Sequence, residues 1–268
     1  MSKKKTAVVM GGTKEFAFAM GTFLLSVLDK SGLFFDECVI FHNGISIEEQ
    51  TSIHQIAPTR FIHYQCPFSD LSRFSKTVEG LYSPMVFSKL ECLKLLKDYR
   101  TVIWFDYDMV AGYDLSELAI AVSGGVKMIL VPRLEEHFHR PLHHPQLETY
   151  ANIHGMHAGV FALHDTIGDY EAMYQYCVDM GNRYAEDLYL PEQILFALML
   201  HEFQLPVYPL PFQLFSPHPT QKGKVWDPYV RLWHAYGADK FWNTLPNPDW
   251  NAYHNRWLQI LHGKGDAI

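Results

Sequence analysis

The stretch TVIWFDYD (residues 101–108) decides how this sequence is interpreted. Five residues typical of a buried strand run directly into two aspartates, Asp106 and Asp108, which are two positions apart. If the chain turns where the strand ends, both carboxylates can converge on one divalent ion, and such hard oxygen ligands suit Mg²⁺ or Mn²⁺. The alternative is a pair of solvated acids in a turn, which is the usual meaning of an isolated D-x-D motif.

Strand and helix patterns alternate around this stretch through the first half of the chain. Apolar runs typical of strands occupy residues 6–10, 37–42, 60–64, 101–105 and 127–131. Helical spacing of apolar residues occupies 16–28, 47–56 and 86–96. This alternation predicts an α/β fold with a mainly parallel sheet covered by helices on both faces. Ligands of such sheets bind beyond the carboxyl ends of the strands, where the D-x-D motif lies.

The second half of the chain is less regular. We predict a strand at residues 158–163 and helices at 170–180 and 191–200. Residues 133–150 are rich in histidine, proline and charge and predict a long loop, while the five prolines in 206–219 predict an extended or turning segment. Aromatic and aliphatic residues from 250 to 261 lie at helical spacing, which indicates either core packing or contact with a membrane-borne glycolipid.

Composition limits the classes of function. The chain has 268 residues, 48% of them hydrophobic, which predicts a globular protein, and the formal net charge of −7 argues against a nucleic-acid partner. Four cysteines without C-x-x-C spacing predict reduced thiols rather than a disulfide framework. No apolar run approaches the ~18 residues of a membrane span. We therefore expect a soluble, cytoplasmic protein.

A second motif, HAYGADKFW (residues 234–242), lies far downstream. The imidazole of His234 can be a third metal ligand, Gly237 permits close backbone approach to a phosphate, and Lys240 can neutralise it. Each residue also has a simpler interpretation, as a core histidine, a turn glycine and a surface lysine. Together with the D-x-D motif they form a coherent site for a metal and a diphosphate.

The ordered motifs resemble those of family 8 glycosyltransferases, the group of glycogenin and bacterial lipooligosaccharide galactosyltransferases. The matching segments are FSKL (87–90), DYD (106–108), DLSEL (114–118), HAGV (157–160) and HAYGADKFW (234–242). The resemblance implies a GT-A fold, Rossmann-like and forming a single domain over residues 1–268. Within it we expect a nucleotide-binding half at about 1–125, an acceptor-binding half at about 126–245 and a C-terminal helix at 246–268.

The resemblance also implies a retaining transfer of a hexose from a UDP-sugar to a hydroxyl of a sugar, glycolipid or glycoprotein acceptor. Asp106, Asp108 and His234 would hold Mn²⁺ (or Mg²⁺), which would bridge the two phosphates. The expected nucleotide-binding residues are Gly11, Gly12, Thr13, Lys14, Tyr107, Gly237 and Lys240. Around the transferred sugar the expected catalytic residues are Lys89, Glu192 and Gln193, with Gln193 beneath the anomeric carbon. The residues alone leave open that Glu192 and Gln193 are the ordinary first turn of a helix, and that residues 11–14 are a plain strand-to-helix turn.

Three positions depart from the family pattern. His157 replaces an asparagine before A-G-V, Glu192 replaces the aspartate of a D-Q element, and Phe241 replaces a proline before Trp242. These departures leave the expected metal site intact and suggest an unusual donor or acceptor.

Two other classes of function compete with a transferase. A sugar-nucleotide pyrophosphorylase would need a glycine-rich basic loop near the N-terminus, where this chain has Lys14 alone. A non-catalytic nucleotide-sugar-binding homologue would be favoured by loss of a metal ligand. The histidines between residues 137 and 157 can bind either an acceptor sugar or a metal, and we favour the acceptor.

Overall fold

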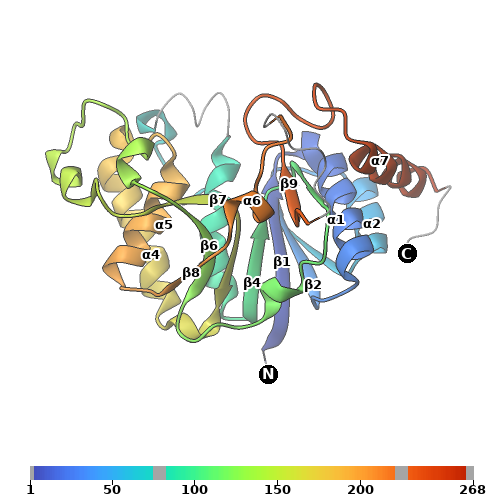
Figure 1. Ribbon diagram of the computed structural model, residues 1–268, viewed down its shortest axis with the longest axis horizontal. Coiled ribbons are helices and arrows are strands. Elements are labelled where there is room, and N and C mark those ends of the chain that lie inside the picture. The colour runs from blue at the N-terminus through green and yellow to red at the C-terminus, as the bar shows by residue number, and fades with distance from the viewer. Residues whose placement is uncertain (1–2, 75–82, 221–228, 264–268) are drawn as a thin grey trace.

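The computed structural model describes residues 3–74, 83–220 and 229–263, and in these ranges a seven-stranded sheet forms its centre (Figure 1). In spatial order the strands are β3 (Thr59–His63), β2 (Glu37–His42), β1 (Lys4–Gly12), β4 (Tyr99–Phe105), β7 (Gly155–His164), β6 (Val126–Val131) and β8 (Val207–Pro209). The first four are parallel, β7 is antiparallel to both β4 and β6, and β8 is parallel to β6. The predicted α/β class with a mainly parallel sheet is confirmed.

Helices cover both faces of this sheet (Figure 1). On one face lie α1 (Ala17–Ser31), α2 (Ile47–Ile56) and α7 (Pro248–Leu261), and on the other lie α3 (Glu91–Leu95), α4 (Tyr170–Tyr184) and α5 (Pro191–Glu202). The central strands are therefore buried on both sides, with Val8 in one core cluster and Val9 in the other. This double burial explains why the strands appear in the sequence as continuous apolar runs rather than as alternating patterns.

Short 3₁₀ helices occur in many of the connecting segments. They are η1 (Lys14–Phe16), η2 (Leu71–Arg73), η4 (Pro84–Leu90), η5 (Ser116–Ala119), η6 (Leu134–His137), η7 (Pro145–Tyr150), η8 (Asp165–Ile167) and η9 (Ala185–Asp187). The helix predicted at 86–96 is thus wrong in kind over its first half, which is 3₁₀ before α3 begins. Every residue of Met85–Leu90 is buried, so tertiary packing sets the helix type there and apolar spacing cannot reveal it. The proline-rich segment contributes β8 and a single turn, α6 (Phe212–Phe215).

A separate two-stranded ladder joins the two sequence motifs. β5 (Met109–Ala111) follows the D-x-D motif and pairs antiparallel with β9 (Leu232–His234), so that Met109 lies opposite His234. The backbone N–H of Ala235 also donates to the carbonyl of Asp108 at 2.9 Å. Two motifs more than 120 residues apart in the chain are thereby fixed against each other.

The aromatic face of α7 is part of the core. Trp250 and Trp257 are 2% and 0% exposed, and Trp257 packs against α1 where Gly21 leaves room for its ring. Of the two interpretations that the helical spacing left open, core packing is the one confirmed. In the described ranges, no helix combines the length and the apolar character that crossing a bilayer requires.

Candidate active site

The two carboxylates and the histidine of the predicted metal site converge beyond the carboxyl end of β4. One ligand atom each from Asp106, Asp108 and His234 lies within 4.8 Å of the others. His234 Nε2 is 3.1 Å from an oxygen of Asp108 and 3.8 Å from an oxygen of Asp106. Two carboxylates and one imidazole are a donor set that can hold a divalent cation.

His234 is held in place by groups that the sequence did not single out. Its Nδ1 lies 2.9 Å from Ser216 Oγ, a buried hydroxyl on the segment that follows α6. With His234 Nδ1–H donating to Ser216, the Nε2 lone pair would be available to a cation held by the carboxylates, which is how a hydrogen-bond partner orients a metal-binding histidine. Ser216 lies in the proline-rich segment, and no sequence pattern marks it as a partner of His234.

Asp106 is oriented by the strand that carries it. The indole Nε1–H of Trp104 donates to Asp106 Oδ1 at 2.8 Å, and the Asp106 backbone N–H donates to the carbonyl of Gly159 on β7 at 2.8 Å. Trp104 itself is 1% exposed and stacks on Phe161. The carboxylate therefore projects from a rigid, fully packed core rather than from a loose turn.

Two lysines supply the positive charge opposite these carboxylates. Lys89 Nζ is 3.1 Å from Asp106 and 3.5 Å from Glu192, and its side chain is only 8% exposed. Burial opposes the charge on Lys89, but the two carboxylates outweigh it and raise the lysine pKa. Lys240 Nζ donates to Asp108 Oδ2 and to the Ala235 carbonyl. Burial alone would raise the pKa of Asp108, yet His234 and Lys240 hold that pKa well below its ordinary range.

The expected catalytic pair begins α5. Pro191 occupies the first turn, Glu192 is 4% exposed and bonded to Lys89, and Gln193 is half-buried. Burial raises the pKa of Glu192. Lys89 thus links the start of α5 to the D-x-D motif through ion pairs with Glu192 and Asp106.

The glycine pair at the end of β1 lies beside the D-x-D motif. A Cβ on Gly11 would lie 2.8 Å from the Trp104 ring, and one on Gly12 would lie 2.7 Å from the Tyr107 ring. Tyr107 in turn stacks on Phe16, with ring centroids 5.1 Å apart, and on Trp242 at 6.4 Å. The structure therefore brings the end of β1, Tyr107 and the downstream motif to one place, with Phe16 as an aromatic neighbour that the sequence did not reveal.

The remaining predicted nucleotide-binding residues lie at the edges of this site. Thr13 is half-buried and Lys14 exposed, and the backbone N–H of Lys14 donates to Asn43 at 2.8 Å. Gly237 has a φ of +81°, a left-handed conformation that favours glycine, and an added Cβ there would meet no described atom within 4 Å. Its backbone is therefore open to close approach.

His157, the departure from the family's asparagine, lies next to the candidate metal-binding residues. Its ring is edge-on to His234, with centroids 5.3 Å apart, and its Nδ1 accepts the Gly159 backbone N–H at 3.2 Å. Burial, with the charges of His234 and Lys89, lowers the His157 pKa to about 3, so the ring is neutral at pH 7. The proton of the neutral ring then sits on Nε2.

The histidine-rich loop does not form a metal-binding group among the residues that the structure describes. His143 and His144 instead donate their backbone N–H groups to the buried carboxylate of Asp187. The backbone carbonyl of His137 accepts the N–H groups of Tyr189 and Leu190, immediately before α5. In the structure this loop therefore braces the segment that leads into Glu192 and Gln193.

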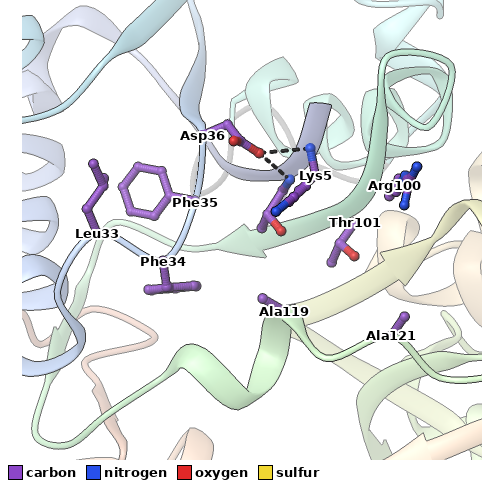
Figure 2. A pocket seen from close by; sticks show the side chains of 10 residues that line it. Lys5, Leu33, Phe34, Phe35, Asp36, Arg100, Thr101, Ala119 and Ala121 are labelled. Carbon is purple, nitrogen blue, oxygen red and sulfur yellow. Dashed lines mark hydrogen bonds between the residues drawn. The ribbon is translucent and has the colours of Figure 1, made fainter. Parts of the chain in front are cut away.

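A cavity of about 490 Å³ lies at the opposite end of the sheet from these residues (Figure 2). It is lined by the starts of β1 and β4, including Thr6 and Thr101, and by Phe34 and Ala119. Because β4 separates Thr101 from Asp106 by about 17 Å at ~3.3 Å per residue, the cavity is not part of the metal site.

A mainly parallel α/β sheet with a carboxylate pair beyond a central strand agrees with the GT-A glycosyltransferase fold that the sequence motifs led us to expect. The chain belongs to glycosyl transferase family 8, whose family model matches residues 7–252. No curated protein matches the sequence.

Solved structures show the same fold. The galactosyltransferase LgtC in complex with donor and acceptor sugar analogues is 16% identical, with a TM-score of 0.67 over 96% of this chain and 95% of that one. An active-site mutant of LgtC is 15% identical, with a TM-score of 0.71 over 98% and 97%. The bifunctional glycosyltransferase WbbM is 14% identical, with a TM-score of 0.67 over 99% of this chain. This chain spans about half of WbbM's length, 52%.

Proposed function

We propose that this glycosyltransferase moves a hexose from a UDP-sugar to an acceptor hydroxyl with retention, using Mn²⁺ or Mg²⁺. The observation that carries the proposal is the convergence of Asp106, Asp108 and His234 within 4.8 Å, brought about by the β5–β9 ladder. A divalent ion held by these three side chains would neutralise the negative charge that develops on the departing diphosphate. LgtC, crystallised with donor and acceptor sugar analogues, supports the same pairing of substrates here.

In the proposed site each residue has a separate task. Lys240 and the open backbone at Gly237 would bind the diphosphate, while residues 11–14 and Tyr107 would line the nucleoside pocket. Lys89 would sit between the D-x-D motif and α5, close to both the donor phosphates and the sugar. Gln193, half-buried and beginning α5 beside Glu192, would lie beneath the anomeric carbon.

The proposed chemistry is a front-face substitution. The bond between the anomeric carbon and the diphosphate oxygen breaks, and the acceptor oxygen bonds to the same face of that carbon. The acceptor proton passes to the leaving phosphate oxygen, so no protein nucleophile is required. The acceptor would be a sugar, glycolipid or glycoprotein. It would bind beside the half of the chain that contains the histidine-rich loop. We also propose that the protein is cytoplasmic.

The family match does not favour the two alternatives, a sugar-nucleotide pyrophosphorylase and a non-catalytic nucleotide-sugar-binding homologue. Asp106, Asp108 and His234 are all present and lie close together. A homologue without catalytic activity would be free to lose one of these side chains, so their presence supports an active enzyme.

The test is release of UDP from a panel of UDP-sugars, with Mn²⁺ and with EDTA. We expect one donor to be turned over, chelation to abolish the turnover, and Asp108→Asn to lower it by on the order of 100-fold or more. Asp98→Asn is the matched control, because Asp98 is an exposed carboxylate just before β4, about 26 Å from Asp106 at ~3.3 Å per residue. Absence of both turnover and UDP·Mn²⁺ binding would refute the proposal.

A further inference from the structure

The ammonium of Lys240 occupies a carboxylate oxygen of Asp108 that the proposed metal ion would also bind. Its ammonium donates to Asp108 Oδ2, while His234 Nε2 lies 3.1 Å from the other oxygen, Oδ1. Both oxygens of the Asp108 carboxylate are thus engaged by cationic or protonatable groups. A divalent ion that binds Asp108 and the ammonium of Lys240 therefore compete for the same charge.

The backbone of Lys240 is fixed, so the exchangeable part is the side chain. The Lys240 N–H donates to Asn243 Oδ1 at 2.7 Å, and the Lys240 carbonyl accepts the N–H groups of Thr244 and Leu245 at 3.1 and 3.0 Å. Beyond this anchor, a flexible four-carbon stem carries a compact ammonium with three rotatable donors. The ammonium can leave Asp108 for a neighbouring anion without any movement of the main chain.

Lys89 differs from Lys240 in this respect. Its side chain is 8% exposed and is held between two carboxylates, Asp106 and Glu192, so moving it away leaves the buried carboxylate of Glu192 without its cationic partner. Lys240 is 20% exposed, and its carboxylate partner, Asp108, retains His234 when the lysine departs. Of these two lysines, Lys240 is the one that can exchange partners at low cost.

We propose that Lys240 is an exchangeable counter-ion, which neutralises Asp108 until a divalent cation takes its place and then transfers its ammonium to the nucleoside diphosphate. The inference deepens the proposed function and rests on it. The bound cation neutralises Asp108 in place of Lys240, and the diphosphate becomes the new partner of the Lys240 ammonium. Metal and nucleoside diphosphate therefore bind with positive coupling, each raising the affinity for the other by the same factor.

The experiment measures Mn²⁺ affinity by electron paramagnetic resonance titration, first with Mn²⁺ alone and then with saturating UDP. In the wild-type protein, UDP should tighten Mn²⁺ binding by about 5- to 150-fold, the usual range of coupling between sites. Lys240→Met removes the competing ammonium at similar side-chain volume. We expect this variant to bind Mn²⁺ alone about tenfold more tightly than wild type, because one close charge is worth about 1.4 kcal/mol or more. UDP should then tighten Mn²⁺ binding about tenfold less than in wild type, and the remaining tightening would come from direct contact between the ion and the phosphates.

Two controls separate this exchange from general effects of charge or folding. Lys240→Arg keeps a cation and should bind Mn²⁺ alone with wild-type affinity. Lys97→Met removes an exposed positive charge before β4 and should change neither quantity. Circular dichroism melting checks that Lys240→Met is folded.

Each outcome decides the matter. Equal or weaker binding of Mn²⁺ alone by Lys240→Met, with UDP·Mn²⁺ binding intact in wild type, overturns the exchange and leaves the proposed function standing. If wild type binds neither Mn²⁺ nor UDP, the exchange falls together with the proposed function. Tighter binding of Mn²⁺ alone, with a smaller tightening by UDP than in wild type, establishes the exchange.

Discussion

A Cβ atom on Gly159 would lie 2.5 Å from Cε1 and 2.8 Å from Nδ1 of His234. Gly159 stands on β7 and His234 at the end of β9, so two sheets meet at this point. The bare backbone of Gly159 is what lets the imidazole lie against the central sheet, within reach of Asp106 and Asp108. The Gly159 carbonyl also accepts the Asp106 N–H, so one residue positions two of the three metal-binding candidates.

Gly159→Ala should therefore displace His234 while leaving the fold intact. Contacts below 3.0 Å to ring atoms cannot be kept, so the imidazole must move away from the carboxylates. We expect at least a tenfold loss of Mn²⁺ affinity, the scale on which outer partners of a metal ligand act. Calorimetric Mn²⁺ titration measures this loss, with the circular dichroism spectrum as the control for folding. Wild-type affinity in a folded variant would show that His234 is not a ligand.

Trp104→Phe should weaken the site through Asp106. The change removes the indole N–H that donates to Asp106 Oδ1 at 2.8 Å and keeps an aromatic ring against Phe161. A hydrogen bond to a charged group contributes about 1.5–3 kcal/mol, so we expect Mn²⁺ affinity to fall about 10- to 100-fold. Phe161→Leu is the comparison, because it perturbs the same packing and leaves the indole N–H in place. Equal effects of the two variants would mean that packing, not the hydrogen bond, orients Asp106.

Lys89→Met should destabilise the whole protein. It would leave the buried carboxylate of Glu192, 4% exposed, without its cationic partner, and such a loss typically costs about 3–5 kcal/mol. Adding Glu192→Gln removes the stranded charge, so the double variant should regain much of the lost stability. Urea unfolding of the wild type, the two single variants and the double variant gives the coupling free energy. Additive effects would show that the two side chains do not form a pair.

The free energy of unfolding should decrease as the pH falls, and His164 should contribute to this decrease. This fully buried ring lies 3.0 Å from Thr101 Oγ1, and burial, with the charge of Lys127, lowers its pKa to about 4. The unfolded chain takes up the proton near pH 6.5, so the stabilising effect of the neutral ring is complete above that pH and is lost as the pH falls toward 4. His164 alone should contribute a slope of about 1.4 kcal/mol per pH unit.

His164→Gln can keep a hydrogen bond to Thr101 but cannot titrate, so its free energy of unfolding should depend less steeply on pH between 6.5 and 4. Urea unfolding at several pH values in this window measures both slopes. Five other histidines also have lowered pKa values, remain in the variant and supply the background slope: His42, His137, His157, His218 and His254. Identical slopes would show that His164 takes up its proton at the same pH in the folded and the unfolded protein.

The sequence by itself determined the α/β class and most of the elements, because strands buried on both faces must be continuous apolar runs and helices must repeat their apolar residues every three to four positions. It also determined which residues can bind a divalent cation, since only a few side chains offer hard oxygen or imidazole ligands. The ordered motifs determined the family. That all 268 residues form one domain stays a prediction.

Tertiary structure decided what local pattern cannot encode. The pairing of Met109 with His234, the hydrogen bond from Ser216 and the space at Gly159 all join residues far apart in the chain, and no periodicity records such contacts. The same holds for the choice of core over membrane for the α7 tryptophans, because helical spacing reveals an apolar face but not what covers it. The residue types predicted the chemistry of the site, whereas the positions of those side chains depend on strand pairing and packing across the whole fold.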